Sequence, residues 1–144
     1  MNDECYEGGF ERGDIDGLFS AMKSKYSAWV SGFAPLVIGV DEPSLAKEYG
    51  RKMMNMKPEI ALVVAKSIFE SDFRSILCDV KIPCSIIQTK KDIAVPLAVP
   101  YYMQCKLGGG ETSSVHILDI DGHLPQLTSP HMLANLFAQI LGRT

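Results

Sequence analysis

The amino-acid sequence predicts an α/β fold in which four short helices precede a strand-helix-strand-helix unit. Three observations support this prediction. In residues 14–69, apolar residues recur at the spacing of an amphipathic helix, between turns that contain proline or glycine. Two short apolar runs follow, at 85–89 and 115–118, and each precedes a new helical pattern. Strands that alternate with helices in this way are typical of a parallel pair joined by a crossover helix.

The first two helices are expected within residues 14–33. Asp14 is expected to cap the first helix, because an acidic side chain at this position accepts hydrogen bonds from the free N–H groups of the first turn. A second helix is expected from Tyr26 to Phe33, ended by Pro35 and Gly39. The apolar stripe of the first helix consists of Ile15, Leu18, Phe19 and Met22.

The third and fourth helices each begin near a proline. Residues 41–44 form the turn before the third helix, and Pro58 lies in the first turn of the fourth, where its missing N–H costs nothing. The third helix is expected to carry Leu45, Tyr49, Met53 and Met56 on one face. The fourth is expected to bury Ile60, Ala61, Val64, Ala65 and Ile68. Short amphipathic helices bury little surface singly, so these four are expected to cover another part of the protein.

The second half of the chain is expected to form the sheet. A short helix around Phe73, Ile76 and Leu77 leads through Pro83 into the first strand at 85–89. The crossover helix is expected from Pro96 to Leu107, closed by Gly108, and the second strand at 115–118. Two strands make a poor sheet, and parallel sheets are normally buried on both faces, so further strands are expected upstream. The last helix has Ser129 as its cap, Pro130 in its first turn, and an inner face of Leu133, Leu136, Phe137 and Ile140.

Length and charge limit the classes of protein to consider. The chain has 144 residues, 47% of them hydrophobic, and a net charge of −3. This length fits one globular domain, and the charge gives no reason to expect nucleic acid or an anionic membrane as a partner. No apolar run reaches the roughly 18 residues that a membrane span needs. The N-terminus lacks the basic-then-apolar order of a secretory signal, so Met1 is read as an internal methionine or as the start of a cytosolic product.

The cysteines give no sign of a metal or redox site. None of the four is spaced as C-x-x-C. Buried free thiols in a reducing compartment are the expected state, and the sequence predicts neither a metal nor a cofactor. The four are Cys5, Cys78, Cys84 and Cys105.

An acid follows the first expected strand, and a glycine-histidine pair follows the second. Asp92 lies directly after the first strand, and His123 lies 31 positions later. In the α/β-hydrolase fold the catalytic residues follow the chain order nucleophile, acid, histidine. The acid holds the imidazole in one tautomer, and the imidazole removes the proton of the nucleophile. The spacing therefore predicts the last two members of such a triad.

The nucleophile of the predicted triad is missing from these 144 residues. The nucleophile elbow of this fold has the pattern G-x-S-x-G, which occurs nowhere in the sequence. Ser31-Gly32 is followed by Phe33-Ala34-Pro35 and has no strand before it. The chain is therefore expected to be the second half of a hydrolase, not a whole enzyme.

Simpler interpretations of the same residues stay open at this point. Asp92 after a strand is also a common turn former or helix cap. A histidine after a glycine in a loop is often solvated. Trp29 and Phe33 share a helix face, and core packing explains that spacing as well as ligand contact does.

A series of short motifs resembles the plant strigolactone esterase and karrikin receptor family of α/β-hydrolases. The resemblance runs nearly from end to end and implies a helical lid (cap) in residues 1–72, followed by the C-terminal part of the hydrolase core in 73–144. Val30, Ile93 and residues 43–52 depart from the common pattern and indicate a divergent, receptor-like branch. The motifs that carry the resemblance are Tyr6-Glu7-Gly8-Gly9-Phe10-Glu11, Gly32-Phe33-Ala34-Pro35-Leu36, Asn55-Met56-Lys57-Pro58-Glu59-Ile60-Ala61-Leu62, Ile68-Phe69-Glu70-Ser71-Asp72, Lys91-Asp92-Ile93-Ala94-Val95-Pro96 and Asp121-Gly122-His123-Leu124-Pro125-Gln126-Leu127.

The resemblance also implies roles for single residues. Asp92 matches the catalytic acid of the family and His123 its catalytic histidine. A small apolar lactone is the implied ligand, and an F-box protein and repressor proteins are the implied partners of the lid, in the cytoplasm and nucleus. Neither nucleic acid nor a membrane is implied. The positions that match ligand-facing residues of the family are Leu18, Trp29, Phe33, Leu36, Ile68, Phe69 and Ile93.

The expected function is a butenolide receptor and esterase of the α/β-hydrolase type. Because the nucleophile is absent, these 144 residues are expected to be inactive alone. The alternative is a module of the same family that binds a small ligand or a protein without hydrolysis.

Overall fold

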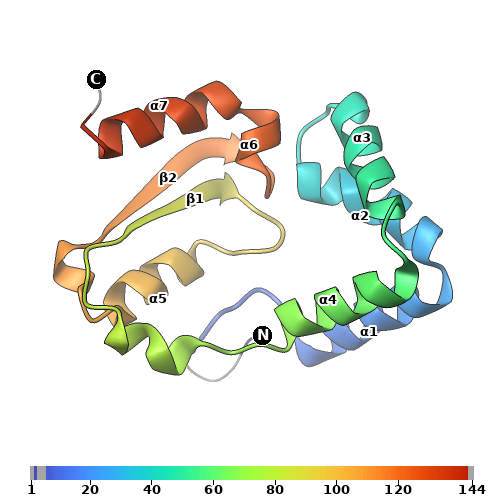
Figure 1. Ribbon diagram of the computed structural model, residues 1–144, viewed down its shortest axis with the longest axis horizontal. Helices are drawn as coiled ribbons and strands as arrows, with labels where there is room; N and C mark the ends of the chain where they lie inside the picture. The colour runs from blue at the N-terminus through green and yellow to red at the C-terminus, as the bar shows by residue number, and fades with distance from the viewer. Residues whose placement is uncertain (1, 3–5, 143–144) are drawn as a thin grey trace.

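The computed structural model describes residues 2 and 6–142 and consists of a helical part and a sheet part (Figure 1). The strands β1 (Ser85–Lys91) and β2 (Ser114–Asp121) are parallel, and α5 (Ala98–Lys106) connects them. The predicted fold class, four helices followed by strand-helix-strand-helix, is confirmed. The other elements are α1 (Arg12–Ser24), α2 (Tyr26–Ile38), α3 (Pro43–Met54), α4 (Pro58–Phe69), η1 (Arg74–Asp79), η2 (Gly110–Thr112), α6 (Pro125–Thr128) and α7 (Pro130–Ile140).

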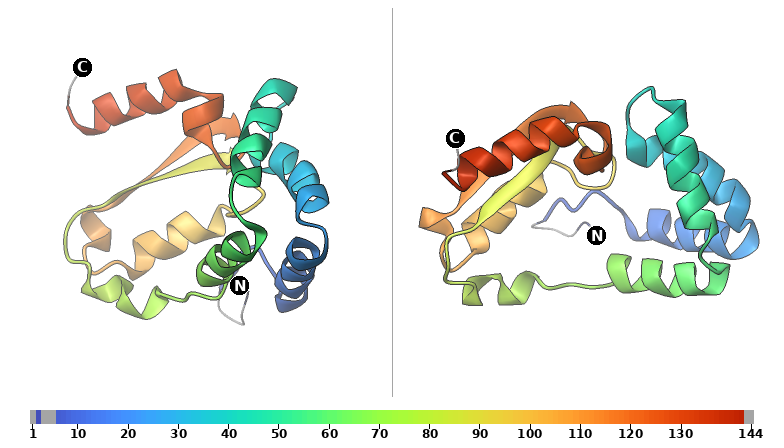
Figure 2. Two further views of the ribbon diagram at one scale, coloured as in Figure 1. Left: turned by 45° about the vertical axis from the view of Figure 1, so that its right-hand side comes forward. Right: turned by 45° about the horizontal axis from the view of Figure 1, so that its top comes forward.

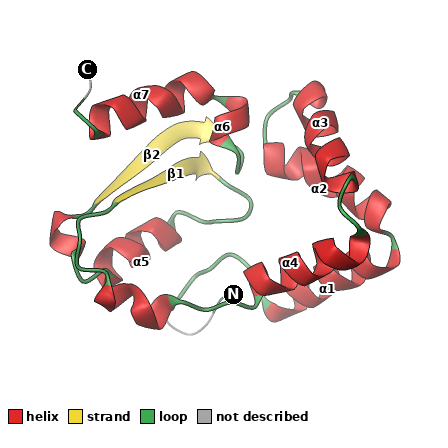
Figure 3. Cartoon of the chain, viewed as in Figure 1, coloured by secondary structure: helices red, strands yellow, loops and turns green. Residues whose placement is uncertain are grey.

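The helices are arranged in two pairs and two flanking layers. Helix α1 packs along α4, and α2 packs along α3; the two pairs meet at an angle beside the sheet (Figure 2). Helices α5 and α7 lie on opposite sides of the strand pair (Figure 3). Among the described residues, no helix has the length and apolar character needed to cross a membrane.

The main core of the described residues lies between α1 and α4. Ile15, Phe19 and Met22 of α1 pack against Ala61 and Ala65 of α4, and all five are buried. The small alanines let the two helices approach closely. The rings of Phe10 and Phe69 close one end of this core edge to face, with centroids 5.4 Å apart. Their contact connects the segment before α1 to the end of α4.

The start of α1 and the end of α2 differ from the sequence prediction. Helix α1 begins two residues before Asp14. Glu11 is its N-cap, and the Glu11 N–H donates to Asp14 Oδ2 at 3.1 Å in a capping box. Helix α2 runs through Pro35 to Ile38 and ends at Gly39, whose φ is 70°. A proline removes only one helical hydrogen bond, and the burial of the last turn offsets that loss.

The sequence predicted more buried apolar residues on α4 and α7 than the structure shows. On α4, Ile60, Val64 and Ile68 are 50%, 42% and 63% exposed, because α1 covers only the side that carries the two alanines. No residue of α7 is buried, and Phe137 is 48% exposed. Met56 lies beyond the end of α3.

Several local predictions in the second half also need correction. The segment after Asp72 is a 3-10 helix, η1, in place of an α-helix. Ser129 holds the N-cap position of α7 but makes no capping hydrogen bond with its side chain. The predicted burial of the thiols was wrong for three cysteines, since Cys78 and Cys105 are exposed and Cys84 is half-buried. Cys5 lies outside the described residues.

Replacing a core isoleucine is expected to destabilise the chain far more than the same change on the surface. Ile15 is 1% exposed, so Ile15→Ala should lower the free energy of unfolding by about 2–5 kcal/mol, from lost burial and the cavity left behind. Ile60→Ala is the matched control, because Ile60 is 50% exposed in α4. Urea unfolding followed by circular dichroism measures both; equal losses would contradict the assignment of the core.

Candidate active site

The candidate site lies where the two parallel strands end. Asp92 directly follows β1, and His123 lies two residues after β2, so the topology brings both to one edge of the sheet. The register changes just before this edge. Thr89 pairs with Leu118, but Lys91 pairs with Asp121, which places one extra residue in β2. Such a bulge bends a strand and redirects the side chains that follow it.

The carboxylate of Asp92 is buried and accepts four hydrogen bonds. Its side chain is only 4% exposed. Oδ1 accepts the backbone N–H groups of Ala94 at 2.8 Å and Val95 at 3.2 Å, which fixes the turn after β1. Oδ2 accepts Nε2 of Gln88 at 3.0 Å and lies 2.8 Å from Nδ1 of His123. The carboxylate is thus held in one orientation by both its own strand and the partner loop.

The contact between Asp92 and His123 fixes the tautomer of the imidazole. An ionised carboxylate has no proton to give, so Nδ1 of His123 must be the donor. A neutral imidazole then carries no proton on Nε2, which can accept one. This arrangement is the one a general base needs. The His123 side chain is 40% exposed and lines a cavity, so it is open to a ligand.

The cavity beside His123 has a volume of about 480 Å³ and is mainly apolar. Helices α1, α2, α3 and α4 supply most of its wall, and the turn after Asp92 contributes Ala94 and Val95. Three rings follow one another along α2. Tyr26 and Trp29 have centroids 5.9 Å apart, and Trp29 and Phe33 have centroids 4.7 Å apart, at interplanar angles of 26° and 18°. The residues at the cavity include Phe10, Met22, Tyr26, Trp29, Phe33, Val37, Tyr49, Met53, Met56, Val64, Ile68, Phe69, Ala94, Val95 and His123.

The structure brings some of the expected ligand-facing residues to this cavity and not others. Trp29, Phe33, Ile68 and Phe69 line it. Three others lie outside its lining: Leu18 packs against the α1–α4 core, and Leu36 and Ile93 are 55% and 51% exposed.

Gln88 is a site residue that the sequence prediction did not identify. Its Nε2 approaches the carbonyl oxygens of Thr89 and Val95 as well as the Asp92 carboxylate, so it joins β1 to the turn that carries the acid. A signal was present, because Gln88 is a polar residue that directly follows two isoleucines of the strand, four positions before the acid. Gln88 is half-buried, and a polar side chain that is partly removed from water needs hydrogen-bond partners; Asp92 is one of them.

Two tyrosines that line the cavity, Tyr26 and Tyr49, were placed on helices by the sequence prediction but not assigned to the site. The hydroxyl of Tyr26 donates to the carbonyl of Met53 at 2.9 Å and links α2 to the end of α3. Burial raises the pKa of Tyr49 above its usual value. Burial, and to a lesser extent the neighbouring Tyr49, raises the pKa of Tyr26. Both phenols therefore favour the neutral form.

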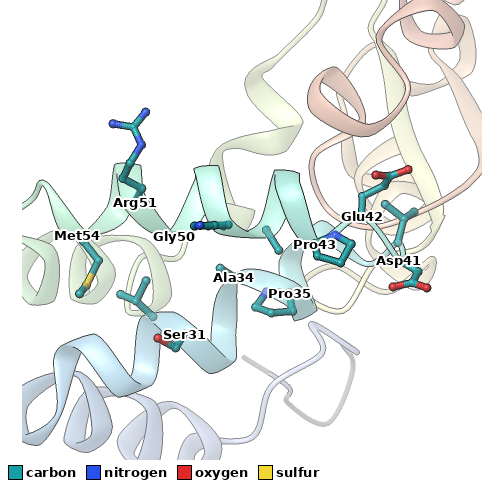
Figure 4. A pocket seen from close by; sticks show the side chains of 13 residues that line it. Ser31, Ala34, Pro35, Asp41, Glu42, Pro43, Gly50, Arg51 and Met54 are labelled. Atoms are coloured by element: carbon teal, nitrogen blue, oxygen red, sulfur yellow. The ribbon is translucent and has the colours of Figure 1, made fainter.

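A second cavity of about 550 Å³ lies between α2 and α3, away from the acid and the histidine (Figure 4). Its floor is formed by Ala34, Pro35 and Gly50, and Asp41 and Glu42 lie at one end. Arg51 also lines the cavity, and its guanidinium points away from the other labelled side chains. In the described part of the chain, no group of three or more histidine, cysteine or acidic residues is arranged to hold a metal ion. The cavity beside His123 is the better candidate site because the acid–histidine pair lies at its edge.

Removing the amide of Gln88 is expected to destabilise the acid. Gln88→Leu leaves Oδ2 of Asp92 without one donor in a buried position, which should lower the free energy of unfolding by about 1–3 kcal/mol. Gln139→Leu, an exposed change on α7, is the control and should alter stability by less than about 0.5 kcal/mol. Urea titration compares the two; similar values would mean that Gln88 does not support the carboxylate.

Alkaline pH is expected to weaken the fold through the cavity tyrosines. A folded-state pKa above the ordinary 10.0 means that the folded chain holds the phenol proton more tightly than the unfolded chain. The stabilisation is fully present below pH 10 and is lost as the pH rises through the folded pKa. Tyr49→Phe should therefore reduce the loss of melting temperature above pH 10, whereas Tyr101→Phe, which removes an exposed hydroxyl, should not.

Comparison with known proteins finds relatives over almost the whole chain. Strigolactone esterase D14 of Arabidopsis thaliana is 47% identical over 143 residues, which are 99% of this chain and 53% of that protein. Karrikin insensitive 2 receptor CA of Petunia hybrida is 52% identical over 134 residues, or 92% of this chain and 49% of the receptor. The chain thus spans about half the length of these relatives. No protein-family model matches it.

Solved structures agree on the fold. A hydrolase from Oleispira antarctica superimposes with a TM-score of 0.89 at 30% identity, over 100% of this chain and 52% of that one. An esterase from Exiguobacterium antarcticum gives a TM-score of 0.87 at 17% identity, over 99% of this chain and 52% of the esterase. These structures are α/β-hydrolases, and the described helices and strands correspond to about half of that fold.

Proposed function

Because this chain belongs to the family of the strigolactone esterases and karrikin receptors and spans about half their length, we propose that it forms the acid–histidine pair and the ligand-covering helices of a butenolide receptor. The observation that carries the proposal is the 2.8 Å contact of His123 with the buried Asp92 at the edge of an aromatic-lined cavity. An acid, a histidine and an apolar cavity are three of the parts that a serine hydrolase uses to cleave a small lactone, and the nucleophile is the fourth.

In the proposed reaction, each residue of the pair has a defined task. Asp92 orients the imidazole and stabilises its protonated form. His123 removes the proton of a serine as that serine attacks the ester carbonyl, and it then returns the proton to the leaving group. The serine is not supplied by a G-x-S-x-G elbow within residues 1–144. We therefore propose that these residues alone bind a butenolide without turning it over.

The cavity fits the proposed class of ligand. Its volume of about 480 Å³ lies in the range of sites for small organic molecules. Trp29 and Phe33 offer flat apolar surfaces to a lactone ring, and Met53 and Met56 can adapt to different substituents. From the same family relationship, we propose that the outer surfaces of the lid helices α1–α4 bind an F-box protein and repressor proteins.

Binding without hydrolysis is the second candidate function. It is favoured by the departure of residues 43–52 from the common family pattern, and a cavity with an oriented histidine can hold a lactone without cleaving it. The two candidates differ only in whether the whole protein cleaves what it binds.

Trp29 provides a direct test of ligand binding. It is the only tryptophan of the chain and lies at the cavity, so a synthetic strigolactone analogue should quench the intrinsic fluorescence in a saturable manner. Phe33→Ala removes an aromatic surface of the cavity and should weaken binding about 10-fold or more, since contact of this ring with the ligand and its burial are worth about 1.4 kcal/mol or more. Leu36→Ala is the control on the same helix, outside the cavity lining.

Turnover of a fluorogenic butenolide ester is measured on the same samples. No hydrolysis that depends on His123 is expected from the isolated chain. A rate that disappears in His123→Ala would refute the proposed inactivity, and absence of saturable quenching in the unmodified chain would refute the proposed binding.

A further inference from the structure

The loop that carries His123 is attached to a lid helix as well as to the sheet. The backbone N–H of His123 donates to the carbonyl of Val37 at 2.9 Å. Val37 lies in the last turn of α2, where helix carbonyls have no partner within the helix. The end of a helix that covers the cavity therefore holds the backbone of the histidine itself.

Two glycines allow the end of α2 and the loop before His123 to approach each other closely. Gly39 ends α2 with φ 70°, and Gly122 precedes the histidine with φ 94°, both in the left-handed region that favours glycine. A Cβ atom at Gly39 would overlap the Cα of Gly122, and one at Gly122 would overlap the carbonyl oxygen of Ile38. The two backbones touch without any side chain between them.

The sheet holds the other side of the same loop. The N–H of Gly122 donates to the carbonyl of Lys91 at 2.8 Å. Thr89 is only 3% exposed, and its hydroxyl donates to the carbonyl of Gly122 at 2.7 Å. The peptide before His123 is thus fixed by β1 on one side and by α2 on the other.

We propose that this α2–loop junction, formed by Val37, Gly39, Gly122 and the His123 backbone, positions the imidazole and couples it to the cavity. Asp92 is held separately by Gln88 and by the turn after β1, so the histidine is the partner that a shift of α2 would move. The inference rests on the proposed role of the pair.

Val37 is the link between the ligand and the histidine. It lines the cavity on the same helix as Trp29 and Phe33, and its carbonyl accepts the His123 N–H. Residues four apart share a helix face, so Trp29, Phe33 and Val37 form one continuous wall. A ligand that pushes on this wall displaces the acceptor of the histidine backbone, and the distance between Nδ1 and Oδ2 changes with it.

Nitrogen-15 NMR of the labelled chain without ligand tests the junction. Long-range correlations report which ring nitrogen of His123 carries the proton, and His116 and His131 serve as internal references. In the unmodified chain Nδ1 should be protonated, and in Gly39→Ala this signature should be lost. Gly32→Ala is the matched control on α2, because a Cβ there meets nothing within 4 Å, and it should keep the native signature.

A second pair of variants covers the case in which Gly39→Ala does not fold. Thr89→Val removes the hydroxyl that holds Gly122, and Thr89→Ser keeps it. The Nδ1 signature should be lost in the first and retained in the second. A folded Gly39→Ala or Thr89→Val chain with the native signature would overturn the proposal. The result is separate from the fluorescence test of butenolide binding, because no ligand is present.

Discussion

The burial of one carboxylate sets the geometry of the candidate site. Asp92 is almost out of contact with water, and a buried charge is tolerated only when its oxygens are fully hydrogen-bonded. Four donors meet this need, from Gln88, from the turn at 94–95 and from His123. The ends of β1 and β2 must therefore remain in register with each other, and the bulge before Asp121 supplies the bend that this requires.

The cavity depends on a different kind of contact. Its wall is made of apolar side chains from four helices, which bury apolar residues between α1 and α4 and along α2. A hydrogen bond from the Tyr26 hydroxyl to the Met53 carbonyl joins α2 to the end of α3 at a defined point. Directional bonds thus fix the acid and the histidine, while adaptable packing shapes the space beside them. Such a division suits a site that keeps its chemistry while ligands vary.

The spacing of apolar residues predicted the existence and order of the main elements. A helix or strand that buries one face needs apolar residues at a regular spacing, and this spacing can be read in the sequence. It could not predict where α2 ends, since the cost of Pro35 depends on whether the turn beyond it is buried. The exposure of Ile60 and Ile68 likewise depends on what faces α4 in three dimensions. For the site, the order of strand, acid, strand and histidine was enough to place Asp92 beside His123, whereas Gln88 and the contact at Val37 belong to tertiary structure.

The facing glycines of α2 and the histidine loop also limit how this sequence can change over time. The obstacle to a side chain at either position is main-chain atoms of the opposite segment, which no replacement elsewhere can make smaller. No substitution at another position can therefore make room for a side chain at Gly39 or at Gly122. Descendants of this chain can lose the pair only by rebuilding the length or path of one of the two segments.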